Sequence, residues 1–136
     1  MPGDPNAVMV SINDPGFEPA RLADGFAAVL RVAFWDVPGE QPIVGELNGQ
    51  RLCFAPITEE QAGDIVEFIA RWHELPDGPE ILLVHCRAGI SRSAALARYA
   101  AQRYRLELAQ TAEFANPEVL RKLRRAADTE PPGEER

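Results

Sequence analysis

Three short runs of hydrophobic residues, each bounded by turn-forming residues, divide the first two thirds of this chain. They cover residues 7–12, 27–34 and 80–84. Apolar runs of this length between proline, glycine and aspartate clusters are typical of buried strands. The first run ends at Asn13-Asp14-Pro15-Gly16, a strong turn signal. We therefore expect three buried strands.

Between the second and third runs, the spacing of the apolar residues changes from that of a strand to that of a helix. Thr58 and Gln61 have the spacing of a capping box, which predicts a helix from about residue 59. Apolar residues then recur at helical spacing and predict one buried face: Ala62, Ile65, Val66, Ile69 and Trp72. Residues 38–56 show no clear period, so we expect an extended loop there.

The last third of the chain predicts helices. Residues 93–101 read as a helix that follows the third strand, and residues 106–114 as a short one. Asn116 before Pro117 is typical of an N-cap followed by proline at the first helical position, so a last helix is expected through about residue 127. Residues 129–136 are rich in proline and glutamate and are expected to be disordered.

The resulting order of elements predicts a small three-layer α/β fold with a mainly parallel central sheet. Residues 1–128 are expected to form a single domain, because the length suits one core and no repeat is visible. The loop after the third strand should lie outside the carboxyl end of a central strand, where open α/β sheets place their ligands.

That loop carries the most informative motif of the chain, His85-Cys86-Arg87-Ala88-Gly89-Ile90-Ser91-Arg92-Ser93. Backbone N–H groups of a loop that opens a helix can converge on one anion, and the helix dipole adds positive charge. We expect an oxyanion such as phosphate to be bound by the residues Arg87, Ala88, Gly89, Ile90, Ser91 and Arg92.

Each chemical role in this loop follows from its residue type. Cys86 should be a thiolate near neutrality and act as the nucleophile, because the field that binds an anion also lowers the pKa of a thiol. Arg92 can hold two phosphate oxygens with its planar fork. Gly89 permits a tight turn. Ser93 can donate a hydrogen bond to the sulfur of Cys86, and His85 can support the loop through its carbonyl groups.

These residues resemble the signature of the cysteine-dependent protein tyrosine phosphatases, in the compact dual-specificity form. The resemblance is strong over residues 79–104 and weaker over 26–78. It implies attack of Cys86 on a phosphoester, hydrolysis of a phosphocysteine, and no metal or other cofactor. Rhodanese-like sulfurtransferases carry their arginine one position earlier, and low-molecular-weight phosphatases carry the motif near the N-terminus, so both are minor alternatives.

The resemblance also implies an aspartate that protonates the leaving oxygen and then activates water. Asp36 follows the second strand but stands fifty residues before Cys86, farther than in the family. An insertion at 38–56 would account for the excess. Asp14 ends the first strand and is the second choice, while Glu46 and Glu59 stay open. Only geometry can decide among these carboxyl groups.

Three functions remain open. The first is a phosphomonoester hydrolase that acts on phosphotyrosine, on phosphorylated protein more generally or on a small phosphomonoester. The second is a phosphate-binding module without turnover, which would lack the acid. The third is a phosphatase of a non-protein substrate, such as a nucleotide or an inositol phosphate.

Charge and composition limit the classes of partner and the location that we expect. The net charge of −7 disfavours nucleic acid and anionic membrane. No apolar run could span a bilayer and the N-terminus does not resemble a signal peptide, so a reducing cytoplasm is the expected location. Of the two cysteines, Cys53 is interpreted first as a small core residue and second as a redox partner of Cys86. The oligomeric state is not predicted.

Overall fold

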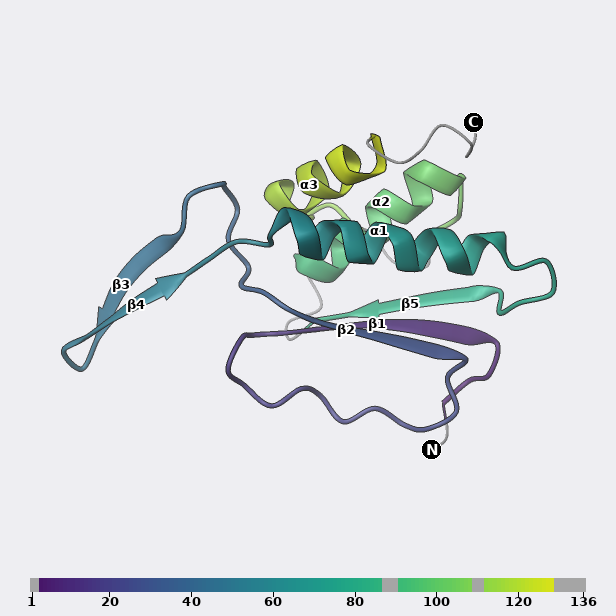
Figure 1. Cartoon of the computed structure of the whole chain (residues 1–136), viewed down its shortest axis with the longest axis horizontal. Helices are drawn as coiled ribbons and strands as arrows, with labels where there is room; N and C mark the ends of the chain where they lie inside the picture. Colours follow the sequence, from purple (N-terminus) through teal and green to yellow (C-terminus); the bar gives the residue numbers. More distant parts are fainter. Residues whose placement is uncertain (1–2, 87–90, 109–111, 129–136) are drawn as a thin grey trace.

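The computed structural model describes residues 3–86, 91–108 and 112–128, and at its centre lies a three-stranded parallel sheet (Figure 1). The strands are β1 (Ala7–Asn13), β2 (Ala28–Ala33) and β5 (Ile81–His85), in the order β2-β1-β5. Val10 of the central strand pairs with Leu30 on one side and Val84 on the other. The α/β class, the mainly parallel sheet and the three strands expected from the sequence are thus confirmed.

One face of the sheet builds the core together with three helices. Val8, Val10 and Ile12 of β1 point into this core, as the alternation of side chains along a strand requires. The helices are α1 (Glu59–Glu74), α2 (Arg92–Tyr104) and α3 (Pro117–Asp128), and all three lie on the same side of the sheet (Figure 1). The predicted apolar face of α1 is buried in full, which confirms that helix and its period.

The opposite face of the sheet carries the connection between β1 and β2 rather than helices (Figure 1). The chain moves across the sheet in one direction from β1 to β2 and in the other direction from β2 to β5. When both connections are right-handed, they must lie on opposite faces of the sheet. The connection from β2 to β5 contains α1, and the connection from β1 to β2 is irregular. The described residues therefore form one helical layer on one sheet, and they show no second helical layer.

Two predictions about strands need correction. The second strand is not buried, because β2 is an edge strand with Val29 exposed by 43%. The third strand is the other edge rather than a central strand, since the order places β1 in the middle. Hydrophobic runs show that a strand is apolar, but they do not show how many neighbours it has.

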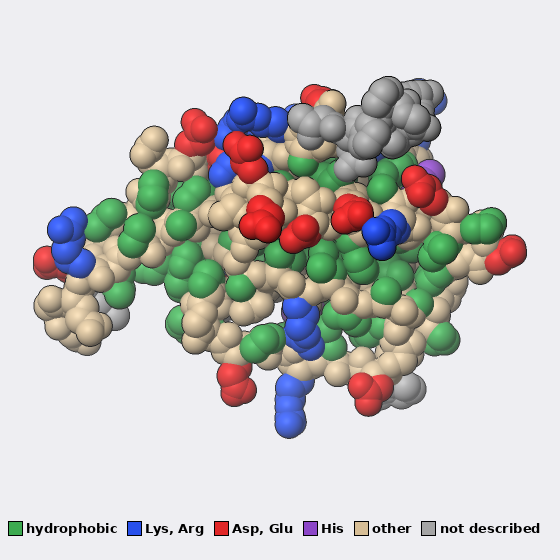
Figure 2. All heavy atoms as spheres, viewed as in Figure 1, with side chains coloured by type: hydrophobic (Ala, Val, Ile, Leu, Met, Phe, Trp, Pro, Cys, Tyr) green, Lys and Arg blue, Asp and Glu red, His purple; other side chains and the backbone are tan. Residues whose placement is uncertain are grey.

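The prediction of a loop at 38–56 is wrong. This segment contains the antiparallel hairpin of β3 (Ile43–Leu47) and β4 (Gln50–Phe54), which extends away from the sheet (Figure 1). Its turn is Asn48-Gly49, with φ of 52° and 79°. Positive φ at both turn residues suits a two-residue turn between right-twisted strands. Figure 2 shows hydrophobic side chains at the surface of the hairpin, and Val44 is 56% exposed.

Both predicted helix starts are confirmed. The Thr58 hydroxyl accepts a hydrogen bond from Gln61 N at 3.0 Å, and the Gln61 side chain accepts one from Thr58 N at 3.0 Å. Asn116 Oδ1 accepts hydrogen bonds from the backbone N–H groups of Glu118 and Val119, at 2.9 and 3.0 Å. Each cap satisfies amide groups that a helix start leaves open, a contribution of about 1 kcal/mol.

The chain between α2 and α3 differs from the prediction of a short helix at 106–114. Residues 106–108 and 112–116 are not helical, and residues 109–111 lie outside the described residues. Leu106 and Leu108 alternate with polar neighbours, which is a period of two rather than the helical 3.6. The tail at 129–136, expected to be disordered, also lies outside the described residues. No helix in the described ranges is both long and apolar enough to cross a membrane.

Candidate active site

Cys86 follows the last residue of β5 directly and is buried, with 6% of its surface exposed. Its sulfur accepts a hydrogen bond from Ser93 N at 3.4 Å and lies 3.3 Å from the Ser93 hydroxyl oxygen. Ser93 is the second residue of α2, so the sulfur stands at the positive end of this helix. The contact expected between Ser93 and Cys86 is present.

Arg92 opens α2 and is nearly inaccessible, with 4% of its surface exposed. Its Nη1 donates to Asp14 Oδ1 at 2.8 Å and to the Phe34 carbonyl at 2.6 Å. A buried guanidinium is tolerable only when it is paired and hydrogen-bonded. Asp14 supplies the opposite charge from the turn after β1, while Phe34 follows β2. The segments that follow β1 and β2, both at the carboxyl end of the sheet, therefore hold the arginine.

The Nε–H group of Arg92 is buried and has no hydrogen-bond partner in the part of the chain that the structure describes. A buried donor without an acceptor costs about 1–3 kcal/mol, and native structures contain few of them. Such a group has no acceptor among the described residues and is available to a ligand that supplies one. An oxyanion fits it, because Nε–H belongs to the planar fork with which arginine binds carboxylate or phosphate.

Asp36 lies beside the other end of the same loop. Its Oδ1 accepts hydrogen bonds from the Ser91 hydroxyl at 2.8 Å and from Asn116 Nδ2 at 2.6 Å. Ser91 precedes Arg92 directly, so the carboxyl group is tied to the loop that carries the cysteine and arginine. Asp36 is also exposed, and no hydrogen bond to its Oδ2 is present within the described ranges. One oxygen is held in place, and the other accepts no hydrogen bond from the described residues.

Asn116 connects this aspartate to α3. Its Nδ2 donates to Asp36 Oδ1 and to the Val37 carbonyl at 3.1 Å, and its backbone N–H donates to the Ser91 carbonyl at 3.0 Å. Because its Oδ1 caps α3 as described above, one buried residue joins the start of a helix, the Asp36 loop and, through its backbone, the end of the Cys86 loop.

His85, predicted to support the loop through its carbonyl groups, contacts β1 in the structure, and loop residues 87–90 lie outside the described residues. Its Nε2 lies 2.8 Å from the hydroxyl oxygen of Ser11, a fully buried residue at the paired position of β1. Burial, and less strongly the positive charge of Arg31, hold the pKa of His85 below its ordinary value of 6.5. The imidazole is therefore neutral at pH 7, and it links the last pair of the β1–β5 ladder.

The remaining predicted site residues fall into two groups. The residues Arg87, Ala88, Gly89 and Ile90, predicted to bind phosphate, lie outside the described residues. Among the open alternatives for the acid, Asp14 is already engaged by Arg92, Glu46 is on the exposed hairpin, and Glu59 lies 3.8 Å from Arg125. Only Asp36 combines a contact with the loop and a carboxyl oxygen that accepts no hydrogen bond from the described residues.

Two further residues lie on or near the hairpin. Cys53 is exposed on β4, so its interpretation as a small core residue is wrong. Trp35, next to Asp36, packs edge-to-face with Phe17 and Phe54 at centroid distances of 6.1 and 4.8 Å. Phe17 is 55% exposed, so an aromatic cluster open to solvent flanks the acid.

Sequence reasoning missed the supporting roles of Asp14 and Asn116. The sequence predicts Asn116 as a helix cap through its side-chain oxygen. An asparagine also carries an amide donor, and this donor was the available signal for a second contact. Asp14 was weighed as an acid, and its position after a parallel strand placed it at the correct edge of the sheet. No sequence signal paired it with Arg92, because 78 residues separate the two.

The assembled site can bind an oxyanion and present a sulfur and a carboxyl group to it. Among the described residues, no group of three or more histidine, cysteine, aspartate or glutamate side chains could hold a metal ion. Comparisons of the chain with protein-family models, with curated proteins and with solved structures find no match. The function therefore has to be argued from this geometry and from the signature at residues 85–93.

Proposed function

We propose that this protein is a cysteine-dependent phosphomonoester hydrolase that acts through a phosphocysteine intermediate. The observation that carries the proposal is the set of contacts around one loop. The Cys86 sulfur accepts a hydrogen bond from Ser93 N, the buried Nε–H group of Arg92 has no partner among the described residues, and Asp36 accepts a hydrogen bond from Ser91. Nucleophile and anion-binding group then come from the two ends of one loop between β5 and α2, and the acid comes from the segment after β2.

In the first step the sulfur of Cys86 attacks the phosphorus, an S–P bond forms and the P–O bond to the leaving group breaks. Asp36 transfers its proton to the departing oxygen, which leaves as an alcohol or phenol. In the second step Asp36 takes a proton from water, the water oxygen attacks phosphorus, and the S–P bond breaks to release phosphate. The Ser93 hydroxyl stabilises the returning thiolate, and Arg92 balances charge on the phosphoryl oxygens.

The hairpin supports the assignment of Asp36. The separation of fifty residues between Asp36 and Cys86 is longer than the family pattern implies. Residues 43–54 form an arm that extends from the body (Figure 1), so they lengthen the chain without moving Asp36 from the loop. The contact of Asp36 with Ser91 also weighs against a binding module that lacks the acid.

We propose phosphotyrosine, in protein or in a small phosphomonoester, as the substrate class. The open aromatic cluster of Phe17, Trp35 and Phe54 flanks Asp36 and suits an aryl leaving group. The loop at residues 86–92 would cradle the phosphate at the carboxyl end of β5. A thiolate nucleophile needs reducing surroundings, which favours the cytoplasm as its location.

The first prediction tests the nucleophile. Cys86→Ser should reduce hydrolysis of p-nitrophenyl phosphate by at least about 10³-fold, because a neutral hydroxyl is a poor nucleophile in this loop. Phosphate affinity and the far-ultraviolet circular dichroism spectrum should be unchanged. Cys53→Ser is the matched control, since it removes the other cysteine and should retain full activity. Activity of Cys86→Ser within tenfold of the wild type would end the cysteine-phosphatase proposal.

A further inference from the structure

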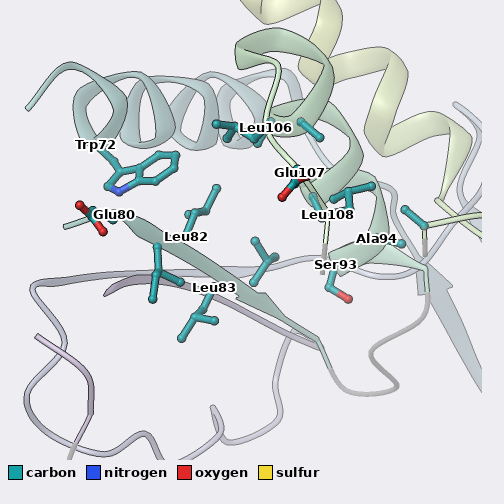
Figure 3. Close-up of a pocket in the computed structure, with 15 residues that line it drawn as sticks. Trp72, Glu80, Leu82, Leu83, Ser93, Ala94, Leu106, Glu107 and Leu108 are labelled. Carbon is teal, nitrogen blue, oxygen red and sulfur yellow. The ribbon is translucent and has the colours of Figure 1, made fainter. Parts of the chain in front are cut away.

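A second site lies along the outer edge of β5, away from the loop chemistry. The structure has a cavity of about 520 Å³ between this edge strand and α2. Figure 3 shows Trp72 at one end, Ser93 at the other, and the segment of Leu106 to Leu108 along one side. We call this cavity the β5 groove. Its volume lies in the range of ligand-binding sites in proteins.

The floor of the groove is an edge strand of the described sheet. β5 pairs with β1 on one side, and no described strand pairs with its other side. The backbone N–H and C=O groups on that side form a template for another strand. Natural proteins protect such edges with lysine, proline or bulges. Residues 81–84 (Ile-Leu-Leu-Val) contain neither lysine nor proline.

The wall opposite β5 is made of small side chains. The residues of α2 that line the groove are Ser93, Ala94, Ala97, Ala100 and Ala101. Alanine at helical spacing leaves little side-chain volume on this wall of the cavity. Ile81 and Leu83 of β5 are 39% and 37% exposed, so apolar surface is available for a partner to bury.

The charge of the residues that line the groove indicates which kind of molecule binds there. Among the described residues that line the groove, two are charged, Glu80 and Glu107, and both are acidic (Figure 3). Neither carboxylate has an ion-pair partner among the described residues. A second copy of the chain would bring the same two carboxylates and a net charge of −7. A peptide with a lysine or arginine would pair with them instead.

We propose that the β5 groove binds an extended, basic and apolar peptide segment of a partner protein, which adds as a strand to the edge of β5. Backbone hydrogen bonds would supply much of the affinity, and alternate side chains would face the alanine wall. The proposal is independent of the phosphatase chemistry, although the groove ends at Ser93, a neighbour of Cys86.

The experiment uses the full chain and a fluorescein-labelled hexapeptide of the sequence Val-Lys-Val-Thr-Val-Arg. Binding is measured by fluorescence anisotropy, and hydrogen exchange of the β5 amides is followed by NMR. We expect saturable binding and slower exchange of the outward amides of residues 81–85. The same peptide with N-methyl groups on alternate residues, which blocks strand pairing, should bind at least about tenfold more weakly.

Two variants test the charge of the groove and the shape of its alanine wall separately. The double change Glu80→Gln and Glu107→Gln should weaken the hexapeptide by about fivefold and reduce its salt dependence. Ala97→Leu, which fills the wall from a half-buried position, should abolish binding. Hydrolysis of p-nitrophenyl phosphate should be unchanged in both, which shows that they fold and that the two sites are distinct.

Three results would overturn the proposal. The first is the absence of binding at 1 mM peptide, a concentration on the order of the weakest specific affinities. The second is equal binding of the N-methylated peptide, which would mean that the strand edge is not used. The third is a dimer in analytical ultracentrifugation that Ala97→Leu dissociates, because a second copy would then be the occupant.

Discussion

At the scale of single residues, the site depends on how each charged group is held. Arg92 is buried, and its pairing with Asp14 uses one nitrogen of the guanidinium while leaving Nε–H without a partner in the described chain. Removing the aspartate would leave an uncompensated buried charge, which costs about 3–5 kcal/mol. We interpret Asp14 as the residue that fixes Arg92 in position, so that the free edge of the guanidinium is ready for the anion.

The second prediction follows from that geometry. Arg92→Lys keeps the positive charge but loses the planar fork, so kcat for p-nitrophenyl phosphate should decrease by on the order of 10²-fold or more. Arg98→Lys, an arginine farther along α2, is the matched control and should keep normal kinetics. A near-normal rate in Arg92→Lys would show that the buried arginine is only structural.

The third prediction concerns Asp36 and depends on the leaving group. General acid catalysis contributes about 10²–10⁴-fold, and a good leaving group needs less of it. Asp36→Asn should therefore slow hydrolysis of phosphotyrosine much more than hydrolysis of an aryl phosphate whose phenol has a low pKa. The comparison of kcat for the two substrates checks this, with the exposed Asp64→Asn as the control.

Asn116 provides a second way to examine the same assignment. Asn116→Ser retains an oxygen that can cap α3 but removes the amide that donates to Asp36. It should reproduce the leaving-group dependence of Asp36→Asn in weaker form, without a large loss of helix stability. Equal slowing of both substrates in Asp36→Asn, or no slowing, would remove Asp36 from the role.

At the scale of elements, sequence patterns were reliable where one local interaction decides the structure. The capping box of Thr58 and Gln61 and the Asn116-Pro117 start are short-range signals, and both helices begin where these signals place them. The hairpin was missed although Asn48-Gly49 is a strong hairpin signal. The prolines and glycines before it, with Gly45 inside β3, interrupt the alternation that would have marked the strands.

Other features of the elements could not follow from local patterns. The burial of β2 and the edge position of β5 depend on how many strands the sheet has and on what covers each face. The pairing of Asp14 with Arg92 and the contact of Asp36 with Ser91 join residues that are 78 and 55 positions apart. Such contacts are consequences of topology, so the sequence could indicate the edge of the sheet but not the partners.

The fourth prediction tests the independence of the hairpin. Gly49 has φ of 79°, where a residue with a Cβ atom costs about 1–2 kcal/mol. Gly49→Val should therefore open the hairpin and speed hydrogen exchange of its amides. Tm should change by less than about 2 °C, since the arm extends from the core. Gly49→Asn tolerates positive φ and is the control. A large decrease in Tm would mean that the hairpin stabilises the domain.

At the scale of the whole molecule, one helical layer covers one face of a small sheet, and the proposed active site and the proposed docking groove lie on different parts of β5. The carboxyl ends of β1, β2 and β5 lead to Asp14, Asp36 and Cys86, so the parallel sheet gathers these three residues at one end. The outer side of β5 holds the groove. One strand can thus serve a catalytic loop at its end and a docking surface along its side.

The last prediction concerns how the stability of the whole fold depends on pH. The pKa of His85 is lower in the folded chain than its ordinary value of 6.5, because of burial and of the charge of Arg31. The unfolded chain then binds more protons near and below pH 6.5, so the free energy of unfolding must decrease as the pH falls through this range. A hydrogen bond to Arg121 likewise lowers the pKa of Glu118 below 4.5, which adds a second loss of stability at more acidic pH.

Urea denaturation at pH 7.5, 6.5, 5.5 and 4.5 measures this dependence. The wild type should lose stability progressively below about pH 6.5. His85→Gln places an amide where Nε2 meets Ser11, and it should be nearly independent of pH between 7.5 and 5.5. His73→Gln, which removes the exposed histidine of α1, should keep the slope of the wild type. If His85→Gln retained that slope, the acid sensitivity would belong to another group and the neutral imidazole beneath the loop would not be its cause.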